Sequence, residues 1–191
     1  MSERRLERQR LQRRALLERV MDRAALEGFD ALDPGELAHE LGGGLRSPGR
    51  VEDLFFPEHG ETLTLLGEML ERVGLLETCL ALARHQQEEQ EHWLRRLAFI
   101  ENQPRLQAHR LRLERDLQAV LAAHFERWGA AGPLGERTAS FEAACVLSAL
   151  REAERLWVAG NGRPALPVLV HEALSVLWPA LYAHARRHIR S

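Results

Sequence analysis

Apolar residues recur along most of the chain at intervals of three and four residues, the spacing that places them on one face of an α-helix. In the first such stretch Leu16, Leu17, Val20 and Met21 follow this rule. The stretches with this spacing are 15–28, 34–41, 47–56, 61–84, 93–101, 105–128, 140–158 and 164–188. None shows the sustained alternation of a strand. We therefore expect an all-α protein of about nine helices, with Pro179 kinking or dividing the last stretch.

Start and stop signals divide these stretches. Asp33-Pro34 and Ser47-Pro48 each combine a good N-cap residue with a proline suited to the first helical turn. The glycines at 42–44 end the helix that begins at Pro34. The polar run HQQEEQEH at 85–92 indicates a turn or a solvated first turn. Asn102-Gln103-Pro104 ends the helix that follows this run, at 93–101.

Composition narrows the class of protein. The 191 residues are 45% hydrophobic and 28% charged, which is typical of a globular chain. No stretch reaches the ~18 apolar residues of a membrane-spanning helix, and the charged N-terminus is not a secretory signal. With only Cys79 and Cys145, a disulfide framework is excluded. We expect a cytoplasmic protein without a membrane partner.

The distribution of charge is more informative than its total. Residues 1–14 carry a net charge of +4, and residues 15–60 carry −6. A basic arm thus precedes three short helices, of which the second and third are joined by a glycine turn. This is the pattern of a helix-turn-helix unit. We divide the chain into a DNA-binding domain at 1–60 and a larger helical domain at 61–191.

The order of these motifs resembles the TetR family of bacterial transcriptional regulators over nearly the full length. ALLERVMDRAALEGFDAL (15–32), ELAHELG (36–42) and SPGRVEDLFFP (47–57) resemble its first three helices. LRRLAFIENQPRL (94–106) and the pair EAACVLSALREAERLWVAGNGRP (142–164) and ALSVLWPAL (173–181) resemble later family helices.

The resemblance implies a homodimer that binds a pseudo-palindromic double-stranded operator and is released by a small-molecule effector, usually as a repressor. The helix 61–84 would connect the domains. The helices 140–159 and 165–188 would pair with their twofold mates. Small residues would allow close approach and leucines would add apolar area: Ala143, Ala144, Ser148, Ala149, Leu169, Leu174, Leu177 and Leu181. The alternative is that both helices simply bury these faces within one chain.

Candidate DNA-binding residues follow from charge and from this resemblance. Arg46 and Arg50 are the cations nearest the reading surface, and Ser47 and Gly49 could approach phosphate through backbone N–H groups. His59 stands where the family has a lysine. The basic arm contributes Arg4, Arg5 and Arg8. Besides His59, the chain departs from the family at the turn GGGLR (42–46), which is long, and at Glu52 or Asp53, where an acid replaces a phosphate-binding tyrosine. An outward carboxylate there would be repelled by phosphate, although it could accept a hydrogen bond from cytosine N4 in the major groove.

Candidate effector-binding residues are the aromatic and polar side chains of the central helices. They are Trp93, Phe99, His124, Phe125, Trp128, Cys145 and Trp157. Ligand pockets are mostly apolar with a few polar anchors, so these residues favour an apolar or aromatic effector. Each of them could equally be ordinary core.

Other chemistry finds little support. His85, Glu89 and His92, and the pair His184 and His188, have ligand spacing but lie in polar, solvated surroundings, so we expect no metal and no cofactor. Neither cysteine has an adjacent cation that would activate it. No catalytic or nucleotide-binding motif appears, so we do not expect an enzyme. The main alternative is a divergent all-α member of the family that acts as a dimeric ligand- or protein-interaction module with weak or lost DNA binding.

Overall fold

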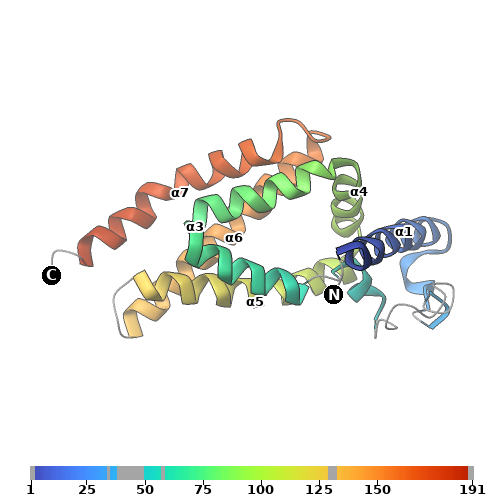
Figure 1. Cartoon of the computed structure of the whole chain (residues 1–191), viewed down its shortest axis with the longest axis horizontal. Helices are drawn as coiled ribbons and strands as arrows, with labels where there is room; N and C mark the ends of the chain where they lie inside the picture. Colours follow the sequence, from blue (N-terminus) through green and yellow to red (C-terminus); the bar gives the residue numbers. More distant parts are fainter. Residues whose placement is uncertain (1–2, 34, 38–49, 57–58, 129–132, 189–191) are drawn as a thin grey trace. The chain divides into compact units, whose positions relative to one another are not determined.

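The computed structural model describes residues 3–33, 35–37, 50–56, 59–128 and 133–188, without side chains at 3–10, 13, 128, 133–137, 178 and 180–188. All regular elements in these ranges are helical (Figure 1), which confirms the all-α prediction. The described ranges contain six α-helices, a further helical stretch at 35–37 and two short 3-10 helices, so the count of α-helices is lower than the nine or so expected. No helix among them is long and apolar enough to span a membrane.

The chain divides into two compact units. The first comprises Met1–Pro57 together with Glu101–His109, and the second comprises Glu58–Ile100 and Arg110–Ser191. The helix expected to connect two domains, α3 (His59–Glu88), belongs to the second unit along its whole described length. Helix α5 (Pro104–Trp128) instead starts in the first unit and continues in the second.

The first unit forms around α1 (Glu3–Glu27), which includes the basic arm in one continuous helix. Two short 3-10 helices, η1 (Phe29–Ala31) and η2 (Val51–Phe55), pack against it. Phe29 and Phe55 meet edge to face with ring centroids 5.9 Å apart. The buried apolar side chains of this unit are Leu16, Leu17, Val20, Met21, Ala24, Phe29, Leu32, Leu37, Val51, Phe55 and Leu106.

The predicted cap at Asp33 is confirmed. Its Oδ1 accepts hydrogen bonds from the backbone N–H groups of Gly35, at 2.6 Å, and Glu36, at 3.0 Å. Residues 35–37 are helical, and the rest of the predicted helix lies outside the described residues, as do the glycine turn and the Ser47-Pro48 cap. The α-helix predicted over 47–56 is wrong for its described part. Arg50 is extended (φ −144°, ψ 150°), and only the five residues of η2 are helical, as a 3-10 turn.

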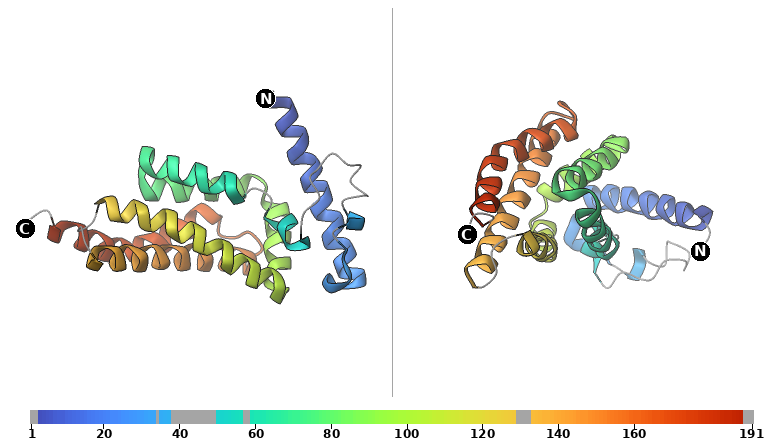
Figure 2. Two further views of the ribbon diagram at one scale, coloured as in Figure 1. Left: turned by 90° about the horizontal axis from the view of Figure 1, so that it is seen from below. Right: turned by 60° about the vertical axis from the view of Figure 1, so that its left-hand side comes forward.

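The second unit packs long helices around one apolar core. Helix α3 is followed by α4 (Gln90–Glu101), most of α5, α6 (Pro133–Ala159) and α7 (Leu166–His188). Figures 1 and 2 show α7 lying beside both α6 and α3. Trp157, Leu166 and Leu174 are fully buried at the centre of this packing.

Three helices of the second unit differ from the sequence prediction. The run 85–92 is helical apart from Glu89, because Gln and Glu are good helix formers and Gln87 accepts a hydrogen bond from the N–H of Leu166 at 2.9 Å. Helix α6 begins at Pro133 rather than near Ser140. Helix α7 continues through Pro179, so the proline does not divide it, and the alternative of a kink stays a prediction. Both Pro179 and Ser175, whose carbonyl the proline leaves unbonded, are exposed, so water can satisfy that carbonyl.

Helix α3 has a break that the periodicity did not predict. Gly74 has φ 80° and ψ 175°, a conformation that is almost exclusive to glycine. The hydroxyl of Thr78 donates a hydrogen bond to the carbonyl oxygen of Gly74 at 2.7 Å. The residues 59–73 and 75–88 are therefore two helical halves joined at one glycine.

We expect Gly74→Ala to lower the free energy of unfolding by about 1–3 kcal/mol, because alanine is strained at this backbone angle. A Cβ at Gly74 would meet no atom within 4 Å, so crowding contributes nothing. Gly67→Ala, in the same helix α3, is the matched control. Its Cβ would make only an ordinary contact with Val120 of α5, at 3.9 Å. It should stabilise the chain by up to about 1 kcal/mol through helix propensity. Urea unfolding followed by circular dichroism measures both, and equal effects of the two variants would contradict the strain at Gly74.

Candidate functional site

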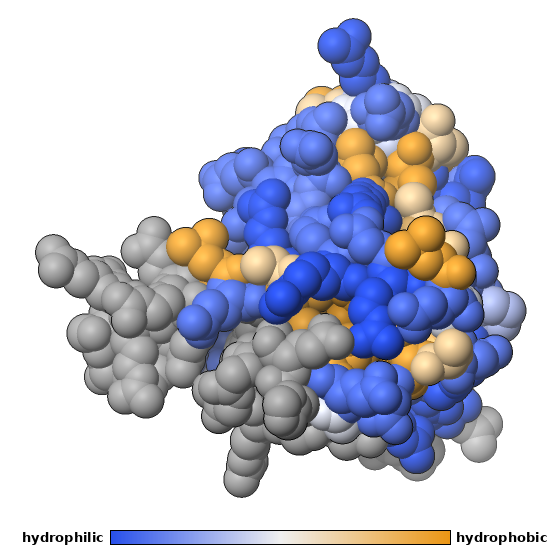
Figure 3. Space-filling model, turned by 90° about the vertical axis from the view of Figure 1, so that its right-hand side faces the viewer, coloured by the Kyte–Doolittle hydropathy of each residue, from blue (hydrophilic) through white to orange (hydrophobic). Residues whose placement is uncertain are grey.

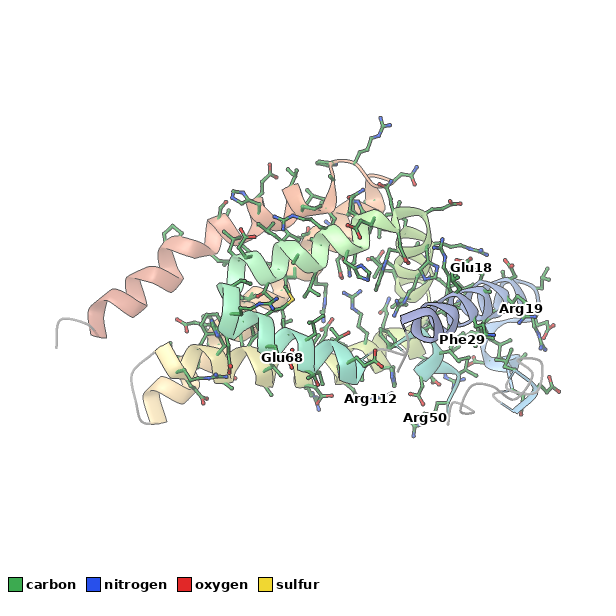
Figure 4. All side chains as sticks on the ribbon, viewed as in Figure 1. Glu18, Arg19, Phe29, Arg50, Glu68 and Arg112 are labelled. Carbon is green, nitrogen blue, oxygen red and sulfur yellow. The ribbon has the colours of Figure 1, made fainter. Side chains whose placement is uncertain are left out.

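The residues predicted to contact DNA are described only in part. Arg46, Ser47 and Gly49 lie outside the described residues. Arg4, Arg5 and Arg8 lie on the first turns of α1, and their side chains are not described. Arg50 is exposed and projects outward from the start of η2 (Figure 4). Of the predicted reading cations, it is the one whose side chain the structure describes.

Glu52 does not face outward as the sequence suggested. It is only 6% exposed and lies on the inner side of η2. The Arg105 guanidinium, at the start of α5, donates to Glu52 Oε1 from Nε at 3.1 Å and from Nη2 at 2.9 Å. The expectation of a carboxylate repelling phosphate is therefore wrong for Glu52, because its charge is paired inside the first unit.

The protonation of Glu52 reflects this pairing. Burial by itself raises the pKa of a carboxyl group, but a backbone hydrogen bond and the Arg105 guanidinium outweigh it and hold the pKa of Glu52 below its ordinary value of 4.5. Glu52 is therefore ionised at neutral pH. The Glu52 carboxylate points into the first unit, where Arg105 binds it, and not toward a ligand.

Asp53 also has a basic neighbour on α5. Its Oδ1 lies 3.5 Å from His109 Nε2, and its side chain remains 45% exposed. The His109 ring is also 5.4 Å from the ring of Phe56. Both Glu52 and Asp53 thus face the first turns of α5, which sequence reasoning did not connect with them.

His59 stands at the start of α3, in the second unit. Its Nε2 is 3.0 Å from Asp116 Oδ2 on α5, and its side chain is 19% exposed. This contact holds the first half of α3 against α5. A second ion pair, between Arg127 and Glu71, joins the same two helices further along.

The predicted effector residues lie in the second unit, where three of them border one core. Trp157 is fully buried, and Trp93 and Phe125 pack against the same cluster. The indole Nε1 of Trp157 has no hydrogen-bond partner among the described residues. Phe99 and Cys145 are half-buried, and the side chain of Trp128 is not described. The core therefore brings aromatic groups and one unused donor together.

Three polar side chains lie in or beside this core: His124 and Cys79, whose pKa values are shifted, and Arg96, which lies over an indole ring. The pKa of His124 is lowered, mainly by burial and also by Arg127, which favours a neutral ring. The Arg96 guanidinium carbon lies 4.4 Å from the Trp93 ring centroid. Burial raises the pKa of the Cys79 thiol to about 12, so this cysteine is a thiol at neutral pH.

A network of charged side chains joins α5 and α6 in the second unit and was not predicted. Arg110 pairs with Glu114, at 3.0 Å, and with Glu154. Arg151 pairs with Glu114, and Gln86 donates to Glu154 at 3.3 Å. These residues alternate in sign and compensate one another. No sequence signal marks them, because they resemble ordinary exposed helix charges.

The metal candidates of the sequence are dispersed. His92 is 6% exposed, whereas His85 is exposed and lies 3.9 Å from Glu88. His184 and His188 have no described side chains. Among the described residues, no group of three or more His, Cys, Asp or Glu side chains is arranged to hold a metal ion.

The face drawn in Figure 3 is mainly polar. On the face drawn in Figure 3, hydrophilic side chains predominate and hydrophobic ones form small, separate patches. In the first unit, the large apolar side chains among the described residues that are well exposed are Leu11 and Leu26. Scattered apolar residues of this kind are normal on a monomeric surface.

In the described residues the fold is all-helical, with a smaller N-terminal unit built on α1 and a larger unit of long helices packed around a core of its own. The family model for the MftR C-terminal domain, a TetR-type C-terminal domain, matches residues 69–182. This match covers more than half of the chain, and the chain belongs to the TetR family of regulators. It is thus a TetR-type transcriptional regulator, of a family whose members are generally not enzymes. Comparison with curated proteins gave no significant match, and neither did comparison with solved structures.

We expect Glu52 to stabilise the chain above pH 4.5 and to lose this contribution as the pH falls through its lowered folded-state pKa. Glu52→Gln should therefore lower the unfolding free energy by roughly 1–2 kcal/mol at neutral pH, and the difference from wild type should shrink in acid. The measurement is urea unfolding at a series of pH values.

The control is Glu152→Gln, which removes another carboxylate whose pKa is lowered, here by an exposed pair with Arg155. Exposed pairs contribute little, so stability should hardly change. A Glu52→Gln variant as stable as wild type at neutral pH would contradict a stabilising role for the pair with Arg105.

Proposed function

We propose that this protein is a DNA-binding repressor that a small-molecule effector releases from its operator. The observation that carries the proposal is the geometry of the recognition segment. In residues 50–56, which we call the recognition segment, Arg50 is exposed, while Glu52 is turned inward and paired with Arg105. The family supports the same function, because its members use such N-terminal helices to read operator DNA.

Charge supports a salt-sensitive interaction. Affinity for duplex DNA comes largely from cations placed on phosphates. The net −6 of residues 15–60 overstates the repulsion, because one acid is paired with Arg105 and another lies beside His109. Arg50 and the +4 arm at 1–14 then provide the attraction. We assign Arg46, Ser47 and Gly49 to the same surface.

The effector would occupy the core of the second unit. Trp93, Phe125 and Trp157 contribute aromatic surface there, and Trp157 Nε1 is a donor that a ligand acceptor could satisfy. His124 is partly buried and favours the neutral state. We therefore propose an effector that is largely apolar or aromatic and carries a hydrogen-bond acceptor.

The dimer would form through α6 and α7. Ala143, Leu169 and Leu174, which the sequence offered for this interface, are buried within the same chain. The apolar area available to a second copy comes from other exposed residues of the two helices, namely Phe141, Leu156, Val168 and Val176. A twofold pair would place two recognition segments on one operator.

A second candidate function is a dimeric ligand- or protein-interaction module that no longer reads DNA. The observation that favours it is the acidic balance of residues 15–60 together with a recognition segment that is only a short 3-10 turn in its described part. Such a protein would keep the effector core and the dimer. It would bind operator and scrambled DNA equally weakly.

We expect Arg50→Ala to weaken binding to a selected operator by about 1–3 kcal/mol, the usual contribution of an arginine that reads a base. Fluorescence anisotropy over a salt series measures it, with the operator selected from a random duplex pool by the wild-type protein. Arg163→Ala is the control, since it removes an exposed arginine from the loop between α6 and α7. Equal affinity of the two variants would remove Arg50 from the reading surface.

We expect Val176→Glu to shift the protein from dimer to monomer, because Val176 is 79% exposed on α7 and a charge there would be buried in the interface. Leu26→Glu is the matched control, since Leu26 is 86% exposed on α1. Multi-angle light scattering after size-exclusion chromatography gives the mass of each variant. A dimer that survives Val176→Glu would place the interface elsewhere.

A further inference from the structure

The polar run at 85–92 spans the junction of α3 and α4, inside the second unit. Its glutamines face protein rather than water. Gln86, Gln87 and Gln90 are all partly buried, whereas Glu88 beside them is exposed. Amide groups that are withdrawn from water need hydrogen-bond partners in the protein. For this run the partners lie at the closed end of the α6–α7 pair.

Helix α6 ends in a closure made by its own backbone. The N–H of Gly162 donates to the carbonyl oxygen of Trp157 at 2.8 Å, and the N–H of Asn161 donates to that of Val158 at 3.0 Å. Asn161 has φ 50°, the left-handed conformation that such a helix end requires. The end of α6 therefore needs no side chain from elsewhere.

The start of α7 has no such local closure. The residue before the helix is Ala165, which has no side-chain acceptor to cap it. Pro167 has no N–H, and the N–H of Val168 reaches the carbonyl oxygen of Ala165 at 3.0 Å. Of the first three helical residues, Leu166 thus has the N–H that still requires an acceptor. Leu166 is fully buried, so water is poorly placed to supply one.

Gln87 supplies this acceptor from the last turn of α3. Its Oε1 accepts the hydrogen bond of the Leu166 N–H at 2.9 Å, although the two residues are 79 positions apart. Its Nε2 donates to Oε1 of Gln90 at the start of α4, which orients the Gln87 amide with its oxygen toward α7. In Figure 1 the loop between α6 and α7 lies beside this end of α3.

The loop itself is packed against Gln90. A Cβ at Gly162 would collide with the side-chain amide of Gln90 and would lie 3.2 Å from Cδ1 of Leu94. Gly162 also has φ 86°, so only glycine fits well at this close approach. On the other side of the run, Gln86 donates to Glu154 of α6 at 3.3 Å. The three glutamines therefore contact α6, the loop and α7 in turn.

We propose that Gln87 and Gln90 form a glutamine clamp that fixes the start of α7 and thereby its register on α6. The clamp stands on contacts within the second unit. Its consequence rests on the proposed function, in which α6 and α7 form the dimer surface. Leu156, one turn before the end of α6, and Val168, in the first turn of α7, are exposed residues of that surface. A clamp that fixes α7 on α6 sets the relative position of these two side chains.

The experiment uses the full-length protein with three test variants and one control. Gln87→Met removes the acceptor and keeps a long side chain. Gln87→Glu keeps an acceptor oxygen, which the N-terminal end of α7 favours as an anion. Gln90→Met removes the group that orients the Gln87 amide. The control, Glu88→Met, places the same new residue at an exposed position of the same turn.

Amide hydrogen exchange by mass spectrometry reports each segment, and sedimentation over a concentration series gives the dimer dissociation constant. We expect Gln87→Met to speed exchange in residues 165–170 about tenfold, the effect of leaving a buried N–H without its acceptor, while residues 112–125 of α5 exchange as in wild type. Gln90→Met should speed it severalfold. Gln87→Glu and Glu88→Met should match wild type. The dissociation constant should rise in the same order.

Three outcomes would overturn the clamp. In the first, residues 165–170 exchange equally fast in Gln87→Met and Glu88→Met. In the second, Gln87→Met speeds exchange in α5 as much as in α7, which would make Gln87 a general support of the core. In the third, Gln87→Glu exchanges as fast as Gln87→Met, which would show that an acceptor at this position does not hold Leu166.

The sedimentation data separate the clamp from the proposed function. A wild-type protein that is monomeric at every concentration contradicts the proposed dimer, while the exchange measurements still decide the clamp. Faster exchange in Gln87→Met with an unchanged dissociation constant would overturn the effect of the clamp on the dimer surface.

Discussion

The pairing of the buried Glu52 carboxylate with Arg105 is the interaction that fixes η2 within the N-terminal unit. A carboxylate that is 6% exposed is costly unless a cation and hydrogen bonds compensate it. Arg105 supplies both, and it comes from a helix that starts some fifty residues later in the chain. The recognition segment is consequently not an independent local motif. Its conformation is tied to the first turn of α5.

This tie changes the meaning of the acidic charge in the first sixty residues. If all charges of residues 15–60 counted equally, this part of the chain would bind phosphate poorly. The effect of a charge depends on its position, however. Glu52 points inward, Asp53 lies beside His109, and Arg50 points outward. An acidic stretch can thus present a basic residue at its surface, and the first turns of α1 are separately rich in arginine.

The second unit combines two kinds of packing. Apolar side chains from α3, α6 and α7 form the core around Trp157, while paired charges join α5 to α6 at its edge. Apolar contacts tolerate small displacements, but ion pairs with defined geometry hold one register. The glycine break in α3 gives the helix opposite α5 two separately oriented halves. The helices around this core are thus of two kinds: α3, which is broken at Gly74, and α5 and α6, which ion pairs hold together.

The sequence by itself determined the helical class, the cap at Asp33, most buried apolar positions and the family, because these depend on residues a few positions apart or on motifs in order. It did not determine the break at Gly74, the start of α6, or the orientation of Glu52. Local pattern cannot show whether a carboxylate on a short helix faces water or protein. That depends on a partner 53 residues away, and only the tertiary structure, by bringing Arg105 within hydrogen-bond distance, makes burial of the charge favourable.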